Sequence, residues 1–387
     1  NGEIAWAYDM VYKKRILGSQ RALQFGGTPI FKHNARMYNC IASYADRLRF
    51  FQECMYLLLC GCGTGFSVQK HHVAKLPKLL HNKVGSKKFV IEDSIEGWSD
   101  AIGALVTSYF EQDELFPEYS GKSVSFDFSK IRPAGSYLSS SSGKAPGPQP
   151  LKKALSNIKK VLDRVTRDGA FSNRQIDPIS VYDIVMHSAD AVISGGVRRS
   201  ATICIFSPDD EEMVKAKTGN WFHENPQRGR SNNSALLLRD KTSTDQFSRL
   251  MESVKEFGEP GFIWSDSTEL VVNPCVEIGL YPVDEDTGET GWQACNLSTI
   301  NCSKIETEDN FYESCKAASI VGTLQAGFNS FPYLGEVSER IIAKEALLGV
   351  SMTGMMDCPD VCLDPEIQRW GAKTVREANK EMAKKIG

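Results

Sequence analysis

The chain has 387 residues, a length that fits one large α/β barrel or two domains of ordinary size. Its net charge of −3 gives no reason to expect a nucleic-acid or anionic-membrane partner, because such partners favour basic patches. No apolar run approaches the roughly 18 residues that a membrane span requires. Eleven cysteines in so long a chain favour a reducing compartment, the cytoplasm, over a secreted disulfide scaffold.

Helix-like and strand-like segments alternate through the first half of the chain. Apolar residues recur at helical spacing over 46–59, which predicts a helix that ends at Gly61. The segments predicted after it are a strand over 65–69, a helix over 94–110, a strand over 124–128 and a helix over 151–165. The segment 136–150, rich in Ser, Gly and Pro, predicts a long loop, and its composition is equally typical of a flexible linker.

The alternation continues in the second half. The predicted helices cover 179–192, 244–256 and, as the final one, about 337–348, and the predicted strands cover 201–206, 261–264 and 270–272. The acidic segment 283–289 is predicted to be a solvated turn. Strands separated by helices are typical of parallel βα units, so the fold class is α/β, with either a barrel or a doubly wound sheet.

The segment Asn273-Pro274-Cys275-Val276-Glu277 combines residue types that carry chemistry. Pro274 has no backbone N–H, so a β-ladder cannot pass through it and the chain must turn, which would place the Cys275 thiol at a loop tip. Residues two apart in an extended segment face the same side, so Asn273, Cys275 and Glu277 would form a compact reactive group. A buried cysteine beside a surface glutamate explains the same pattern.

Six motifs in consistent order resemble the ribonucleotide reductases, and several of them resemble the adenosylcobalamin-dependent branch of that family. NPCVEI followed by ACNLSTINC is similar to the finger loop of the active site and its downstream redox cysteine. The other motifs are LLLCGCGTGFSV (57–68), IRPAGSYLSSSSGKAPGPQP (131–150), ISGGVRRSA (193–201), SNNSALL (231–237) and EALLGVSMTG (345–354). The resemblance covers about residues 33–360.

The resemblance implies a ten-stranded α/β barrel with Cys275 on a finger loop threaded into its centre. It implies one catalytic domain over 1–387, with further chain at either end left open and with no N-terminal ATP-binding regulatory domain. The Ser- and Thr-rich loop that binds substrate phosphates in the family is not found before Gly387.

The resemblance also implies a mechanism. Cys275 would carry a thiyl radical that removes the 3′ hydrogen of a ribonucleotide, with Glu277 as general base on the 3′-hydroxyl and Asn273 holding the 2′- and 3′-oxygens. Cys40 and Cys295 would form the dithiol that reduces the substrate and becomes a disulfide. The implied cofactor is adenosylcobalamin, whose Co–C homolysis starts the radical chemistry. The sequence has no Asp-x-His-x-x-Gly corrin-binding motif, and the resembling enzymes bind the cofactor against the barrel.

Two further groups of residues follow from the resemblance. Those expected to bind substrate are Asn39, Gly63, Gly65, Ser194, Gly195 and Gly196, and those expected in loops that sense a deoxynucleotide effector are Arg132, Ser142, Gly143, Arg198 and Arg199. The motifs favour triphosphate over diphosphate substrates, a thioredoxin-like or dithiol reductant and a monomer. The charge and the lack of a long apolar run predict neither nucleic-acid nor membrane partners.

Two alternatives remain open: the large subunit of a metal-radical ribonucleotide reductase, and a nucleotide-binding relative that has lost catalysis. Cys54, Cys60 and Cys62 are interpreted as core residues, because they lie at the end of an apolar helix without suitable histidines. Cys358 and Cys362 are interpreted as structural. The pair His71-His72 is interpreted as a surface feature, and no metal site is predicted.

Overall fold

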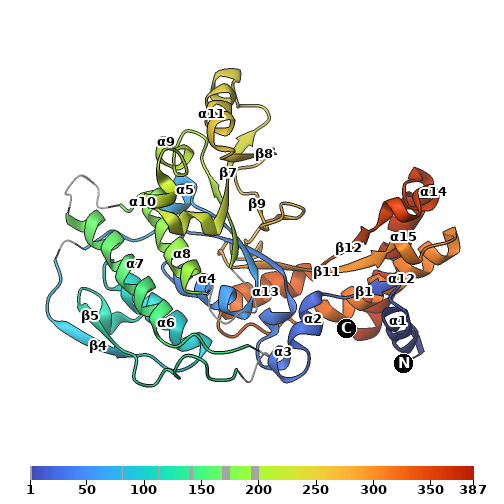
Figure 1. Ribbon diagram of the computed structural model, residues 1–387, viewed down its shortest axis with the longest axis horizontal. Coiled ribbons are helices and arrows are strands. Elements are labelled where there is room, and N and C mark those ends of the chain that lie inside the picture. The colour runs from blue at the N-terminus through green and yellow to red at the C-terminus, as the bar shows by residue number, and fades with distance from the viewer. Residues whose placement is uncertain (1, 81, 112–113, 139–142, 168–174, 193–199) are drawn as a thin grey trace. The chain divides into compact units, whose positions relative to one another are not determined.

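The computed structural model describes the chain except for residues 1, 81, 112–113, 139–142, 168–174 and 193–199 (Figure 1). The contacts divide the chain into two compact units. The smaller unit combines residues 1–40 with residues 294–387, and the larger unit covers residues 41–293.

A parallel sheet organises the larger unit. The strands lie in the order β2 (Cys40–Tyr44), β3 (Gly63–Ser67), β6 (Ala201–Phe206), β7 (Ser231–Leu238) and β8 (Gly261–Ser265). Strand β3 is parallel to β6, β6 to β7, and β7 to β8. Helix α4 (Arg49–Cys60) connects β2 to β3, α8 (Pro178–Ala191) precedes β6, and α11 (Thr244–Phe257) connects β7 to β8. These connections confirm the predicted parallel βα units.

Local sequence explains where these elements begin and end. Gly61 adopts the left-handed conformation (φ 91°) that ends α4, and its N–H donates to the carbonyls of Leu57 and Leu58. Asp177 caps α8 by accepting a hydrogen bond from the N–H of Ser180, and proline occupies the first turn. Strand β6 spans the residues predicted for it and packs Ile203 and Ile205 into a core with Leu236 and Val272.

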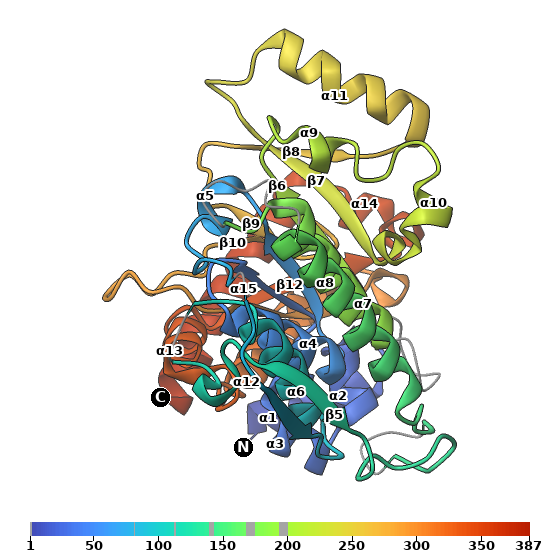
Figure 2. The same cartoon turned by 90° about the vertical axis from the view of Figure 1, so that its left-hand side faces the viewer.

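Three helices pack together beside this sheet. Helices α6 (Ile95–Thr107), α7 (Gln149–Arg167) and α8 lie side by side in Figures 1 and 2. Strands β4 (Ser86–Val90) and β5 (Ser123–Asp127) form a separate parallel pair. The other short elements of the larger unit are α5 (Lys70–Val73), α9 (Glu211–Val214), α10 (Trp221–Glu224), β9 (Val271–Val272) and β10 (Gly279–Leu280).

The smaller unit contains three paired strands and its own buried core. Strand β11 (Gln293–Asn301) pairs with β1 (Ile16–Leu17) in antiparallel and with β12 (Leu347–Thr353) in parallel orientation. Its helices are α1 (Gly2–Tyr12), α2 (Gln20–Phe25), α3 (Thr28–Lys32), α12 (Glu308–Ala326), α13 (Gly335–Glu345), α14 (Pro359–Cys362) and α15 (Pro365–Ile386). Helix α12 packs against α1, α15 and β12, and its residues Phe311 and Ile320 share a buried cluster with Met10 and Ile300.

The predicted final helix, 337–348, is wrong at its C-terminal end. Helix α13 ends at Glu345, Ala346 adopts the left-handed conformation (φ 42°), and the chain continues as strand β12. A short apolar run such as Leu347–Val350 fits a helix or a strand equally well, and pairing with β11 decides between them. Helix α13 is also not the last helix, because Asp364 caps the 22-residue helix α15.

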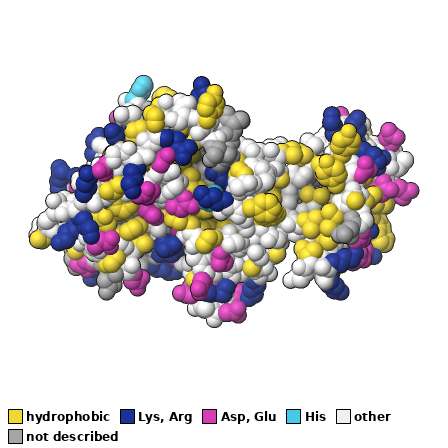
Figure 3. Space-filling model, turned by 90° about the horizontal axis from the view of Figure 1, so that it is seen from below, with side chains coloured by type: hydrophobic (Ala, Val, Ile, Leu, Met, Phe, Trp, Pro, Cys, Tyr) yellow, Lys and Arg dark blue, Asp and Glu magenta, His cyan; other side chains and the backbone are white. Residues whose placement is uncertain are grey.

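The surface agrees with the modest net charge. Lys and Arg side chains are interspersed with Asp and Glu side chains on the face shown in Figure 3, and neither sign gathers into a large patch there. Among the helices that the structure describes, none is both long enough and apolar enough to cross a membrane.

Candidate active site

The segment Asn273–Glu277 lies at the tip of a β-hairpin. Strands β9 and β10 pair in antiparallel orientation with Val272 opposite Gly279. The N–H of Val276 donates to the carbonyl of Asn273 at 2.9 Å, and Val276 has a φ of 66°. The turn expected after Pro274 is therefore present, and its left-handed residue is Val276, a strained conformation for a β-branched side chain.

The three predicted catalytic residues of this hairpin differ in exposure. Asn273 is fully buried, and its Oδ1 accepts a hydrogen bond from the N–H of Ile278 at 3.1 Å, which closes the loop. Cys275 and Glu277 are exposed. The expectation that Asn273–Glu277 is extended is wrong, because these residues form a turn. The structure thus presents the Cys275 thiol at an exposed tip and anchors that tip through Asn273.

The hairpin rests on strand β3, which carries two of the predicted substrate-binding residues, Gly63 and Gly65. Both glycines are buried. A Cβ on Gly65 would lie 1.7 Å from the carbonyl oxygen of Val272 and 3.3 Å from Cβ of Ala42, so no other residue fits there. The structure thus shows a packing reason for Gly65, and substrate binding by both glycines stays a prediction.

The predicted redox cysteines are 255 residues apart in sequence, from Cys40 to Cys295, and both belong to the smaller unit. Both are buried thiols rather than halves of a disulfide. The Tyr38 hydroxyl donates to the carbonyl of Ala326 at 3.3 Å. Burial raises the pKa of Tyr38, and the nearby Cys295 thiol raises it further. A buried tyrosine therefore stays protonated beside Cys295, while the pairing of the two cysteines stays a prediction.

Asn39 is the remaining predicted substrate-binding residue among those described. Its side chain is already engaged in a hydrogen bond. Its Oδ1 accepts a hydrogen bond from Nε of Arg21 at 2.7 Å. Arg21 is itself buried and donates from Nη1 to Gln24 at 2.6 Å. The position next to Cys40 is thus fixed by a buried guanidinium, and contact with substrate stays a prediction.

The predicted effector loops are only partly described. Nε of Arg132 donates to Asp93 at 2.6 Å, and the buried Gly143 accepts a hydrogen bond from the N–H of Leu138 at 3.2 Å. The predicted residues Ser142, Ser194, Gly195, Gly196, Arg198 and Arg199 lie outside the described residues.

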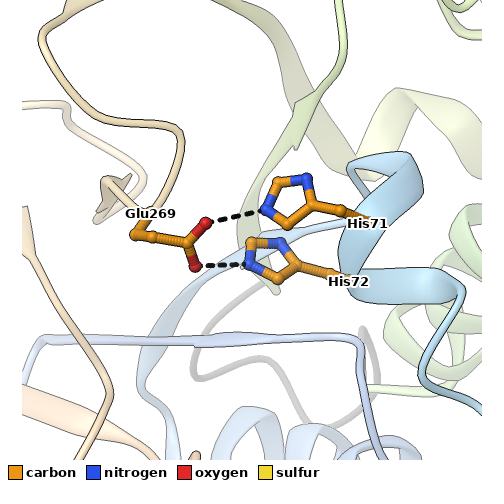
Figure 4. A group of neighbouring side chains, drawn as sticks. All are labelled: His71, His72 and Glu269. Atoms are coloured by element: carbon orange, nitrogen blue, oxygen red, sulfur yellow. Dashed lines mark hydrogen bonds and ion pairs between the residues drawn. The ribbon is translucent and has the colours of Figure 1, made fainter.

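The structure also assembles a cluster that sequence reasoning missed. His71 and His72 of α5 both point at Glu269, with Nε2–carboxylate distances of 2.9 and 3.0 Å (Figure 4). His72 is fully buried, so its interpretation as a surface residue is wrong. Burial lowers the pKa of His72 to about 4, which keeps the ring neutral. No sequence signal links these histidines to a glutamate almost 200 residues away.

Most other cysteines are core residues, as predicted. Cys54, Cys60 and Cys62 are buried. In the smaller unit the thiol of Cys362 is hydrogen-bonded to those of Cys302 and Cys358, and burial raises the pKa of Cys362 to about 12. A thiol with so high a pKa carries little thiolate, so it is a poor nucleophile at neutral pH.

Comparison with known proteins relates the chain to one enzyme family. Residues 68–162 match the family model described as the insertion domain of B12-dependent ribonucleotide reductase. The adenosylcobalamin-dependent ribonucleoside-triphosphate reductase of Lactobacillus delbrueckii subsp. bulgaricus is 25% identical over 349 residues, which cover 78% of this chain and 44% of that protein. The enzyme of the same name from Lactobacillus helveticus is 24% identical, covering 90% of this chain and 54% of that protein.

The fold agrees with these relatives. A crystal structure of B12-dependent (class II) ribonucleotide reductase matches with a TM-score of 0.77 at 20% identity, over 98% of this chain and 62% of that one. This likeness confirms the α/β fold predicted from the motifs. The chain spans about half the length of the curated relatives it matches. In sequence the chain is therefore similar to the adenosylcobalamin-dependent ribonucleoside-triphosphate reductases, and in fold it is similar to class II ribonucleotide reductase.

Proposed function

We propose that the protein carries out radical reduction of ribonucleotides, with triphosphates as the favoured substrates, to 2′-deoxyribonucleotides. The observation that supports this most is the β9–β10 hairpin, which presents the Cys275 thiol at its exposed tip and holds that tip through the buried Asn273. The matched relatives are ribonucleoside-triphosphate reductases by name, which supports the substrate class.

Each step of the proposed reaction can be assigned to a residue of this chain. The Cys275 sulfur, once oxidised to a thiyl radical, takes the 3′ hydrogen atom of the ribose, and Glu277 accepts the 3′-hydroxyl proton. The 2′-hydroxyl then leaves as water. Cys40 and Cys295 supply two electrons and two protons and become a disulfide. Cys275 finally returns the hydrogen atom to C3′ and Glu277 returns its proton to the 3′-oxygen, so the sulfur is a radical and Glu277 a carboxylate again at the end of the cycle.

Asn273 would position the substrate in this scheme. Its Oδ1 is held by the N–H of Ile278, which fixes the orientation of the amide and therefore of its two N–H donors. Because the side chain is fully buried, it has little freedom to lose when it binds the ribose oxygens.

The residues present fit adenosylcobalamin as the cofactor. The oxidant must reach the Cys275 sulfur from outside the hairpin, and that residue is exposed. Val276, 44% exposed next to it, offers an apolar contact for a large flat cofactor. When bound, adenosylcobalamin would supply the one-electron oxidation that forms the radical on the Cys275 sulfur.

The partners follow from the same proposal. The disulfide left after each turnover requires a thioredoxin-like or small dithiol reductant, so we expect the protein to work in a reducing compartment, the cytoplasm. The loops around Arg132 and Arg198 would bind a deoxynucleotide effector. We expect R198A to flatten the effector dependence of substrate choice more than it lowers the basal rate. If every rate fell equally and the preference pattern stayed as in the wild type, the loop would be a scaffold only.

A single assay tests the proposal. The full chain is incubated with a ribonucleoside triphosphate, adenosylcobalamin and a dithiol. The cofactor is left out in a parallel reaction, and in a third it is replaced by a candidate metal-radical partner subunit. We expect deoxynucleotide only when the cofactor is present. Product that requires a metal-radical partner subunit instead would favour the large subunit of that other class. Nucleotide binding without any product under either condition would favour a relative that has lost catalysis.

A further inference from the structure

The cluster of His71, His72 and Glu269 is unlike an ordinary surface ion pair. A ring nitrogen of each histidine and one carboxylate oxygen of Glu269 all lie within 4.8 Å of one another. His72 is completely buried, whereas the side chains of His71 and Glu269 are 41% and 31% exposed. One side of the cluster is therefore fixed in the protein and the other side is open to solvent.

The backbone around Glu269 is held in place from several directions. The Tyr44 hydroxyl donates to the Glu269 carbonyl at 2.6 Å, and the Glu269 N–H donates to Ser267 at 3.1 Å. The amide of Gln69, which lies just before α5, donates to the Thr268 carbonyl at 2.7 Å. These bonds fix the loop between β8 and β9, so the carboxylate is presented to the two rings before any ligand arrives.

The ring of His72 is fixed as firmly. It stacks on Tyr44 with a centroid distance of 3.9 Å and an interplanar angle of 12°. Its Nδ1 lies 2.9 Å from the Ser67 hydroxyl. A hydroxyl can donate or accept, so Ser67 can hold the ring in either tautomer. Bonding of the second ring nitrogen to an oxygen is the arrangement that usually orients histidines that bind metals.

We propose that His71, His72 and Glu269 bind a divalent first-row transition-metal ion such as Zn²⁺, through the two Nε2 atoms and the carboxylate. Ligand atoms that bind Zn²⁺ at about 2.0–2.2 Å in a tetrahedral site lie about 3.4 Å apart. The observed 2.9 and 3.0 Å between nitrogen and oxygen are close to that spacing. Two imidazoles and one carboxylate suit zinc and its neighbours rather than Ca²⁺ or Mg²⁺, which prefer oxygen ligands.

The surrounding charges are compatible with a cation at this point. Asp46 lies close enough to influence His72, and it pairs with Arg47 at 3.2 Å and with Lys75 at 3.7 Å. Glu269 therefore supplies the negative charge for the ion. The exposed side of His71 and Glu269 leaves room for water as a fourth ligand, as in sites with three protein ligands.

The site would link two segments that are far apart in sequence. The histidines belong to α5, at the carboxyl end of β3, and Glu269 lies two residues before β9, the first strand of the hairpin that carries Cys275. A bound ion would therefore fasten the base of that hairpin to α5. The metal site stands independently of the proposed ribonucleotide reduction, because it rests on this cluster alone.

The test is binding of Co²⁺ and Zn²⁺ to the purified full chain after removal of metal with a chelator. Calorimetry gives the affinity, and the visible absorption of Co²⁺ reports its ligands, because thiolate ligands add an intense charge-transfer band that nitrogen and oxygen ligands lack. The variants are H71A and E269Q, both at partly exposed positions that keep the buried His72 in place. H223A, which removes an exposed histidine elsewhere, is the matched control.

We expect one ion per wild-type chain, no thiolate band, and at least tenfold weaker binding in H71A and in E269Q but not in H223A. The ion should also raise the melting temperature of the wild type and of H223A only. The proposal is overturned if the wild type binds no ion, if H71A and E269Q bind as tightly as H223A does, or if the spectrum shows thiolate ligands. In those cases the cluster is a hydrogen-bonded contact without metal.

Discussion

The carbonyl oxygen of Val272 occupies the space in which any side chain at Gly65 would begin, since a Cβ there would lie 1.7 Å from that oxygen. Gly65 belongs to β3 and Val272 ends the first strand of the hairpin that carries Cys275. The position of the proposed radical residue therefore depends on the absence of a single methyl group in the neighbouring strand.

We accordingly expect G65A to displace the hairpin. The substitution should lower the free energy of unfolding by about 1–3 kcal/mol, as overpacking of a core usually does. The rate of deoxynucleotide formation should fall by more than the loss of folded protein explains, because the Cys275 thiol is displaced. Chemical denaturation and the reductase assay measure the two effects. G229A is the control, because its Cβ would meet no atom closer than 3.9 Å. Equal stability of G65A and G229A would contradict the close approach.

The second prediction concerns the thiol of Cys275. C275S should abolish deoxynucleotide formation and leave the melting temperature within experimental error, because the residue is exposed and serine has a similar size. An O–H bond is too strong for the proposed hydrogen-atom transfer, so no radical can form there. C358S, at a partly buried cysteine outside the hairpin, should retain activity. Appreciable turnover by C275S would remove Cys275 from the mechanism.

The third prediction concerns Cys40 and Cys295. After one turnover without an external reductant, the two residues should be linked by a disulfide, which requires their Cα atoms to lie within about 4.4–6.8 Å. Peptide mapping under non-reducing conditions measures the link, and protein incubated without substrate is the control. Both thiols remaining reduced after stoichiometric product formation would show that another pair supplies the electrons.

The fourth prediction concerns the protonation of Lys83 and its effect on the pH dependence of folding stability. Burial lowers the pKa of this lysine to about 7, and its Nζ lies over the ring of Tyr109 and donates to Ser108 at 3.0 Å. In the unfolded chain the pKa of this lysine returns to the ordinary value of about 10.4. The unfolded state therefore binds more protons between these two values, so this group makes the folded state relatively more stable as pH rises from 7 to 10.

NMR of the protein with isotopically methylated lysines can measure that pKa directly. We expect one lysine resonance to titrate near pH 7 and to be missing from the spectrum of K83R. A set of resonances that all titrate near pH 10 would show that the Lys83 amine is well solvated.

The sequence by itself led to the proposed chemistry and predicted most of the regular elements. Strand 201–206 is apolar except for Thr202, and helix α4 ends at the glycine expected to end it. These features are local, since burial periodicity and terminating residues act within a few positions. The proline before Cys275 likewise predicted a turn because its effect on the backbone does not depend on the rest of the fold.

Only the tertiary structure decided the features that depend on residues far apart in sequence. Leu347–Thr353 is a strand because it pairs with β11, although its local pattern fits a helix equally well. Cys40 and Cys295 belong to one compact unit, and His72 is buried against Glu269, although nearly 200 residues or more separate the members of each pair. The physical reason is that burial and hydrogen bonding depend on which segments meet in space, and a local pattern carries no information about that.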